Sequence, residues 1–284
     1  MAEGRRNRAL GWIGVALVGM FVTLALLAPV IRPYRAAALS GSSLGAPNLH
    51  HLLGTNQIGQ DLFSQMLDGA RTSLLVAVLA GGGALVLGTA VGVLAGWRAG
   101  LVDMVLMRMV DVVLAMPRLP LLIVVGAFVG SSLRMVALVI ALVFWPGTAR
   151  AVRSQVLSLR RRTHLKAAVG FGASTGHILR RHVIPEIGLI LVAQLLAAMG
   201  RAILIEAGLA FLGIGDFSRT SWGSIMRAAR ESPGLYYGPT WLWWMLPPMM
   251  AIMLVLLGLT FIGVAVEQRI NPRLARHTAG RAGT

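Results

Sequence analysis

Long apolar stretches, each free of charged residues, alternate with short polar segments along the chain. No charged residue occurs between Arg8 and Arg32, and a second such stretch covers residues 72–97. A helix needs about 20 mostly apolar residues to cross the hydrocarbon core of a bilayer. The pattern therefore predicts six transmembrane helices, at about residues 10–31, 72–97, 106–129, 135–149, 187–209 and 243–266.

The first apolar stretch follows basic residues, as the apolar core of a secretory signal peptide would. It is longer than such a core, and no small-x-small cleavage motif follows it directly, because residues 32–35 are Arg-Pro-Tyr-Arg. We therefore expect this stretch to be the first membrane span.

Composition points to an integral membrane protein of the all-α class. Hydrophobic residues make up 56% of the chain and charged residues 13%, whereas soluble domains average about 25% charged residues. The chain has no cysteine, which excludes disulfides and thiolate metal sites. The formal net charge of +16 comes from basic residues that are spread between the apolar stretches. They form no patch interleaved with aromatic residues, so we expect no nucleic-acid partner.

The placement of the basic residues predicts the orientation of the spans. One side of the membrane holds 17 of the 26 Lys and Arg residues, and the opposite side holds seven. The side with 17 comprises the two terminal segments, the segment between spans two and three, and the segment between spans four and five. By the positive-inside rule, both termini and the segment 150–186 lie in the cytoplasm. The polar segments 33–69 and 211–239 then lie outside, the latter with a short amphipathic piece near 222–229.

The segment 150–186 is predicted to contain two helical stretches around a glycine turn. Gly170 and Gly172 interrupt the helical composition, because glycine accepts left-handed backbone angles. Ser174 is suited to cap a second short helix, which we expect to end before Pro185. On composition alone, an ordinary basic loop is the simpler interpretation. The spacing of its residues instead favours a compact knob that docks on a soluble partner.

Two alanines precede Gly172 by four and five residues, and an Ile-Pro pair follows at a fixed distance. This spacing resembles the cytoplasmic "EAA" loop of bacterial ABC importer permeases, the loop that docks on a separate ATPase. Lys166 stands where that family has Glu. The resemblance implies that six residues couple this chain to the ATPase, namely Lys166, Ala167, Ala168, Gly172, Ile184 and Pro185.

Further motifs extend the resemblance over nearly the whole chain. In this order and spacing they are similar to the dipeptide/oligopeptide/nickel type of ABC importer permease, of the subunit type with a large outer loop after span one. The motifs are His-Leu-Leu-Gly-Thr at 51–55 with Gly59 and Asp61, Gly-Ala-Arg-Thr-Ser-Leu at 69–74, Met-Arg-Met-Val-Asp at 107–111 with Pro117, Trp-Pro-Gly at 145–147, Gln-Val-Leu-Ser-Leu at 155–159, Glu-Ala-Gly-Leu at 206–209, Phe-Leu-Gly-Ile-Gly at 211–215, Ser-Trp-Gly at 221–223 and Asn-Pro-Arg-Leu at 271–274.

That family implies a subunit of an ATP-driven importer in the bacterial cytoplasmic membrane, surrounded by lipid. Its expected partners are a second permease, of a different chain, two cytoplasmic ATPase subunits and an external substrate-binding protein. Short peptides are the expected cargo, and nickel or another small solute is the alternative. The resemblance implies no cofactor in this chain, because ATP would be bound by the partner subunits.

The sequence itself excludes a phosphate-binding P-loop in this chain. Such a loop needs Gly-x4-Gly-Lys-Ser/Thr, and the only lysine, Lys166, is followed by Ala167. We therefore expect no ATPase site and no catalytic residue. The Lys166 substitution need not abolish docking, because exposed ion pairs contribute about 0–1 kcal/mol.

Three glycines in the second span lie on one helix face. Gly88, Gly92 and Gly96 are spaced at i, i+4 and i+8, and faces of small residues let membrane helices approach closely. They form a packing seam within the subunit or against the partner permease, or they arise by chance in a chain with 34 glycines.

Charged residues inside the predicted spans are candidates for the transport pathway, because intramembrane charges are costly. Asp111 is three residues from Arg108 and can pair with it at the inner interface. Arg118 follows a proline and can extend its side chain toward that interface. Arg201 and Glu206 are five residues apart, roughly 140° around the helix. Each is expected to face the pathway or to bond another span.

Two other classes of protein remain as alternatives. An ion-coupled secondary transporter is disfavoured by six spans, the lack of an inverted repeat and few intramembrane carboxylates. An intramembrane enzyme is disfavoured because no Gly-x-Ser-Gly or His-Glu-x-x-His pattern occurs, and the six histidines suggest no metal site. We divide the chain into residues 1–70, a transmembrane helix with an external segment, and residues 71–284, a five-helix permease core with the coupling loop 150–186.

Overall fold

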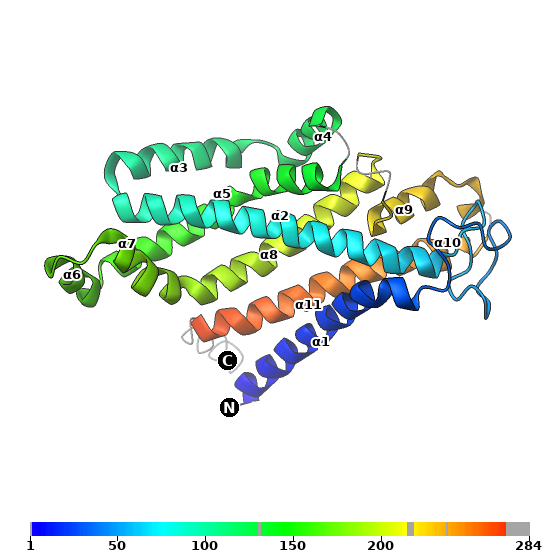
Figure 1. The fold of residues 1–284 in the computed structure, drawn as a ribbon, viewed down its shortest axis with the longest axis horizontal. Coiled ribbons are helices and arrows are strands. Elements are labelled where there is room, and N and C mark those ends of the chain that lie inside the picture. Colours follow the sequence, from blue (N-terminus) through cyan, green and yellow to red (C-terminus); the bar gives the residue numbers. More distant parts are fainter. Residues whose placement is uncertain (1, 130–131, 215–218, 237, 271–284) are drawn as a thin grey trace, which may run out of the picture.

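The computed structural model describes residues 2–129, 132–214, 219–236 and 238–270, and it is built from helices. Figure 1 shows a bundle of long helices with short helices gathered at its two ends. The elements in chain order are α1 (Ala2–Ile31), α2 (Leu62–Arg98), α3 (Gly100–Ala115), α4 (Arg118–Val129), α5 (Leu133–Arg160), α6 (Thr163–Gly170), α7 (Thr175–Ile178), the π-helix η1 (Leu179–Val183), α8 (Ile184–Phe211), α9 (Trp222–Glu231), the 3₁₀-helix η2 (Pro233–Leu235), α10 (Thr240–Trp244) and α11 (Leu246–Ile270).

Among the described residues, five helical stretches are each long and apolar enough to cross a membrane. They are α1, α2, α5, the stretch 175–211 that ends with α8, and the stretch 240–267 that contains most of α11. The bent pair α3 and α4 makes a sixth span if it is counted as one. These findings confirm the all-α membrane class, with five or six spans.

The third predicted span, at 106–129, is a bent pair of helices and not one continuous helix. Helix α3 ends at Ala115 and α4 begins at Arg118, and their axes differ by 85°. Between them Met116 has an extended backbone with φ −73° and ψ 137°. The cause is Pro117, which lacks an N–H group and disfavours the helical conformation of the residue before it.

Two other helix boundaries also differ from the hydropathy pattern. Helix α2 begins at Leu62, ten residues before the predicted span. Asp61 caps it, because its Oδ2 accepts a hydrogen bond from the Ser64 N–H at 2.7 Å. Helix α5 continues to Arg160, beyond the predicted end of the fourth span. Hydropathy marks the apolar part of a helix, whereas a cap or a break marks its end.

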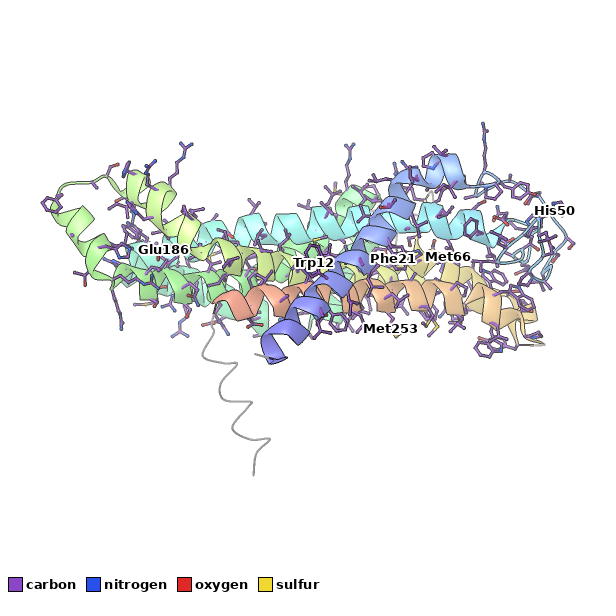
Figure 2. All side chains as sticks on the ribbon, turned by 90° about the horizontal axis from the view of Figure 1, so that it is seen from below. Trp12, Phe21, His50, Met66, Glu186 and Met253 are labelled. Atoms are coloured by element: carbon purple, nitrogen blue, oxygen red, sulfur yellow. The ribbon has the colours of Figure 1, made fainter. Side chains whose placement is uncertain are left out.

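Helix α2 lies at the centre of the bundle, packing along α5 and against α8. Helix α1 packs on α11 and on α2. The segment 33–61 lies with α9 and α10 at one end of the bundle, which we call the loop end; α6 and α7 lie at the opposite end, the knob end. Figure 2 shows His50 at the loop end and Glu186 at the knob end.

Side chains of the loop end are tied together by a buried polar pair. His51 Nδ1 lies 2.9 Å from Asp61 Oδ1, and both side chains are buried. The His51 ring also stacks on Tyr34 at 5.1 Å. The motif at 51–61 therefore has a structural role, holding the loop against the start of α2.

Helix α9 is wedged between α2 and α8. Trp222 is fully buried, and its ring meets Phe21 of α1 edge to face at 5.6 Å. A Cβ on Gly223 would lie 2.5 Å from the Ala207 carbonyl oxygen, so only glycine allows this approach to α8. The short amphipathic piece expected near 222–229 forms the helix α9.

Candidate functional site

The segment between α5 and α8 forms a small projecting knob, which we define as residues 161–183. Apolar side chains fasten it to the long helices. Leu165, Ile178 and Val183 are buried and belong to one cluster with Val152 of α5 and Ile187 of α8. Burying such side chains contributes about 1.5–3 kcal/mol each. The knob is therefore held firmly to the ends of two spans.

Ion pairs to Glu186 add a second attachment. Arg162 Nη1 lies 2.8 Å from Glu186 Oε2, and His164 Nε2 lies 3.1 Å from Glu186 Oε1. Both pairs join the start of the knob to the first turn of α8. They are partly exposed, so each contributes little to stability.

The exposed tip of the knob is apolar. The Phe171 side chain is 91% exposed, and Gly172 beside it has a φ of +81°. The left-handed conformation predicted for Gly172 is confirmed. Ser174 caps α7, as predicted, by accepting a hydrogen bond from the His177 N–H at 3.4 Å. Ala167 is exposed on α6, while the side chains of Lys166 and Ala168 lie outside the described part.

The second helix of the knob does not end before Pro185, as the sequence suggested. It continues from α7 through η1 into α8, and Ile184 and Pro185 are exposed in the first turn of α8. The Ile184 N–H donates to the Leu179 carbonyl five residues back. This π turn keeps a helical course through a proline that has no N–H to donate.

The three glycines of α2 lie against α5. A Cβ at Gly88 would lie 2.6 Å from Thr148 Cβ, one at Gly92 would lie 2.6 Å from the Ala149 carbonyl oxygen, and one at Gly96 would lie 2.8 Å from Val156 Cβ. Such distances are shorter than real Cβ contacts. The structure thus places the seam within this chain.

Asp111 pairs with a partner other than the predicted Arg108. Its Oδ1 lies 2.5 Å from Arg150 Nη2 of α5. One helical turn further on, Arg153 of α5 forms a bidentate pair with Asp103 of α3. Neither pair could be predicted from the sequence, because the paired residues are far apart in the chain. They become neighbours only when α3 folds back along α5.

Two arginines lie over one buried phenyl ring inside the bundle. The Arg118 guanidinium carbon is 5.4 Å from the centre of the Phe144 ring, and that of Arg201 is 5.9 Å from it. The aromatic face attracts a cation, by about 2 kcal/mol where water is excluded. Phe144 therefore holds two like charges near each other within the spans, one from α4 and one from α8.

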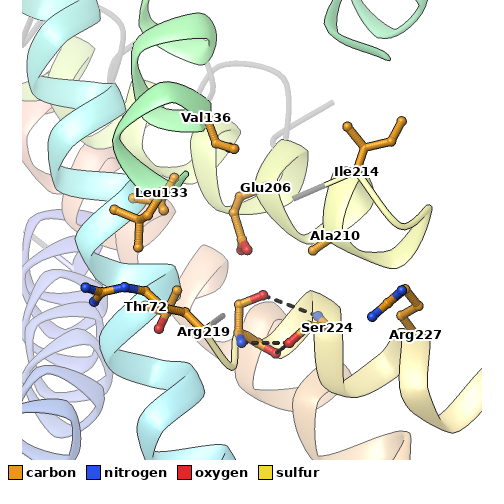
Figure 3. Close-up of a pocket in the computed structure, with 11 residues that line it drawn as sticks. Thr72, Leu133, Val136, Glu206, Ala210, Ile214, Arg219, Ser224 and Arg227 are labelled. Atoms are coloured by element: carbon orange, nitrogen blue, oxygen red, sulfur yellow. Dashed lines mark hydrogen bonds between the residues drawn. The ribbon is translucent and has the colours of Figure 1, made fainter. Parts of the chain in front are cut away.

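Glu206 belongs to a different junction from Arg201. It is buried, and its Oε2 accepts a hydrogen bond from Ser73 Oγ of α2 at 3.1 Å. Ser73 Oγ in turn accepts from the Trp222 N–H at 3.3 Å. Figure 3 shows Glu206 pointing into a small cavity of about 30 Å³, which Arg219 and Ser224 also line. Glu206 thus joins α8 to α2 and α9.

Comparison with known proteins identifies the class. The family of binding-protein-dependent transport system inner membrane components matches residues 88–276. The chain belongs to this family, so it is a multi-pass permease component of the bacterial inner membrane. The matched range contains the three glycines, the knob and Glu206, while Ser73, the partner of Glu206 on α2, precedes it. Transport systems of this kind include ATPase and substrate-binding components.

Individual relatives match over almost the full chain. A peptide permease protein of Brucella suis biovar 1 is 36% identical over 274 residues, covering 94% of this chain and 88% of that protein. The dipeptide transport system permease protein of Alkalihalophilus pseudofirmus is 33% identical over 271 residues, covering 95% and 88%. A peptide transport system permease protein of Brucella suis biovar 1 is 35% identical over 264 residues, covering 92% and 87%.

Several residues at these sites escaped the sequence argument. Phe171 directly precedes Gly172, but the sequence of an apolar-rich chain gives no sign that this apolar residue is exposed. Ser73 and Phe144 carry no charge, so the search for intramembrane charges passed over them. The tail motif at 271–274 lies outside the described residues.

Proposed function

We propose that this chain forms half of the membrane pathway of an ATP-driven importer of short peptides. The exposed apolar tip at Phe171 and Gly172, on a knob fastened to α5 and α8, is the observation that carries the proposal. The Phe171 ring projects from this left-handed turn, and its burial in a partner's groove would contribute about 1.5–3 kcal/mol to docking. The tip suits a groove on an ATPase subunit.

The attachments of the knob give the coupling a physical route. Closure of two ATPase subunits on ATP moves the grooves that hold the knobs. Because Leu165 and Ile178 are buried against the spans, and Glu186 ties the knob to α8, the knob moves with α8 as one body. The spans then change access from the outside to the inside.

The proposed complex contains a second, different permease chain, two ATPase subunits and an external binding protein. Peptide cargo is inferred from relatives that are named as peptide and dipeptide permeases. The chain itself binds no ATP and is not an enzyme. Both termini and the knob end are assigned to the cytoplasm, and the loop end to the outside.

Within the pathway we assign different tasks to three of the intramembrane charges. Arg201, which shares the Phe144 ring with Arg118, is the candidate for contact with cargo. Asp111, paired with Arg150, positions α3 against α5. Glu206 holds the α2–α8–α9 junction through Ser73.

The test measures binding of the purified ATPase subunits to the membrane chain. Phe171→Ser removes the apolar tip, and loss of that burial weakens binding by roughly 10- to 100-fold. Leu49→Ser is the matched control, because Leu49 is 95% exposed at the loop end. Unchanged ATPase binding by Phe171→Ser would exclude the tip as the docking element. ATP hydrolysis by the pure chain alone would refute the proposed division of labour.

A further inference from the structure

A large cavity opens between α1 and α2 at the loop end. Its volume is about 680 Å³, within the range of about 300–1,000 Å³ that is typical of small-molecule sites. The proposed function leaves this cavity unused. Its lining divides into a basic rim and an apolar wall, and the two parts lie at different depths along the helices.

The rim carries a surplus of positive charge. Four arginines, Arg32, Arg35, Arg71 and Arg219, line the cavity together with one acid, Asp68. Arg32 pairs with Asp68 at 2.7 Å. Within the described ranges, Arg35, Arg71 and Arg219 have no ion pair, and all three are exposed. Planar guanidinium groups bind phosphate oxygens in pairs, which makes such a rim an anion site.

The wall below the rim consists of apolar side chains on two membrane spans. Val22 and Leu26 of α1 face the cavity with Leu75 and Val78 of α2, and all four are exposed. Val22 lies nine residues before the end of α1, a rise of about 13 Å. Half of the hydrocarbon core measures about 15 Å. The wall therefore runs through most of one leaflet.

We propose that this cavity binds an anionic phospholipid, with its phosphate at Arg35, Arg71 and Arg219 and its acyl chains between α1 and α2. The depth of the apolar wall selects a lipid over a free anion. The net charge of the rim selects an anionic headgroup over a zwitterionic one, because basic pockets between spans favour anionic headgroups. With the loop end outside, the lipid belongs to the outer leaflet.

Binding of phosphatidylglycerol to the purified, delipidated importer complex tests the proposal, measured by native mass spectrometry. Arg35→Gln with Arg71→Gln weakens the affinity by about 30-fold, from about 1 kcal/mol per arginine near an anionic surface. The control is Arg98→Gln with Arg134→Gln, which removes the same charge from two exposed arginines outside the cavity and leaves binding unchanged. Val78→Trp fills the groove and abolishes binding while the rim stays intact.

Several outcomes would overturn the proposal. Equal affinity for phosphatidylcholine would show that the cavity does not select an anionic headgroup. Displacement of the lipid by millimolar inorganic phosphate would show that the acyl chains do not contribute to binding. Unchanged binding in both the arginine double variant and Val78→Trp would remove the site. Because the chain has no cysteine, Val78→Cys introduces a single thiol that tests whether the partner permease occupies the cavity instead of a lipid. Its cross-linking to the partner permease would make the groove a subunit interface.

Discussion

At Gly172 the knob turns with a backbone angle that side chains rarely adopt. Its φ is +81°, and among the described residues other than its two chain neighbours a Cβ there would meet no atom within 4 Å. A substitution therefore acts through backbone strain or through contact with a docked partner. The described part of the knob offers no atom for the new side chain to clash with, and the two remaining causes can be separated by the choice of side chain.

We expect Gly172→Val to weaken ATPase binding and peptide uptake at matched membrane expression. A β-branched residue in the left-handed region costs roughly 1–2 kcal/mol. Gly172→Asn is the companion, because asparagine tolerates that region. If Asn restores binding, strain is the cause; if both variants bind equally poorly, the partner rejects any side chain there. Wild-type binding and uptake by Gly172→Val would show that this turn is not part of the coupling element.

Glu206 is the intramembrane residue whose role can be decided by a conservative change. We expect Glu206→Gln to keep both thermal stability and uptake, because the amide oxygen still accepts the Ser73 hydroxyl. Glu206→Leu should cost about 1–3 kcal/mol, because Ser73 then loses a buried partner. Thermal unfolding in detergent and uptake in proteoliposomes measure both. Normal stability with lost uptake in Glu206→Gln would instead assign the charge to the pathway.

Single residues were predictable where the backbone decides and less so where packing decides. Left-handed Gly172 and the Ser174 cap follow from local chemistry. The partner of Asp111 does not, because Arg150 lies 39 positions away in the sequence. The prediction that Arg108 pairs with Asp111 was wrong because the acidic side chains of α3 point toward α5.

At the scale of helices, close contact between α2 and α5 depends on glycine. A Cβ on Gly92 would lie 2.6 Å from a backbone oxygen and 2.8 Å from Val152 Cβ. A Cβ on Gly82, ten residues earlier, would meet no atom within 4 Å from the described residues outside its own stretch of helix. The same substitution at the two positions therefore isolates packing from helix propensity.

We expect Gly92→Ala to destabilise the protein by about 1–3 kcal/mol, the usual cost of overpacking. Gly82→Ala should be neutral or stabilise it by about 0.5–1 kcal/mol, because alanine favours a helix. The melting temperature of the purified chain in detergent measures both. If the two variants have the same melting temperature, the contact between α2 and α5 tolerates a methyl group, and the two helices can move apart at little cost in free energy.

The existence of the helices followed from hydropathy, but their ends and bends did not. Pro117 was visible in the sequence, yet whether a membrane proline kinks a helix or breaks it depends on what satisfies the freed carbonyls. Pro185 gave the opposite error, because the π turn at 179–183 carries the helix through it. Each outcome depends on packing around the proline, which the pattern of apolar residues does not contain.

At the scale of the molecule, the two ends differ in construction. The loop end is held by buried polar pairs such as His51 with Asp61, and by the packing of Trp222. The knob end is held by apolar burial and by partly exposed ion pairs to Glu186. This difference suits a rigid end that receives a binding protein and an end that moves with an ATPase.

The orientation of the molecule rests on the excess of basic residues at one end, and it can be tested because the chain has no cysteine. Useful probes are exposed at the two ends: Ser43 and Ala228 at the loop end, and Thr175 on the knob. We expect an impermeant thiol reagent on intact cells to label single cysteines at positions 43 and 228 and to spare position 175. Permeabilised cells, in which all three should react, provide the control for accessibility. Labelling of position 175 alone from outside would show that the orientation is the reverse of the predicted one. The knob would then lie where no ATP is available, and the proposed coupling would be refuted.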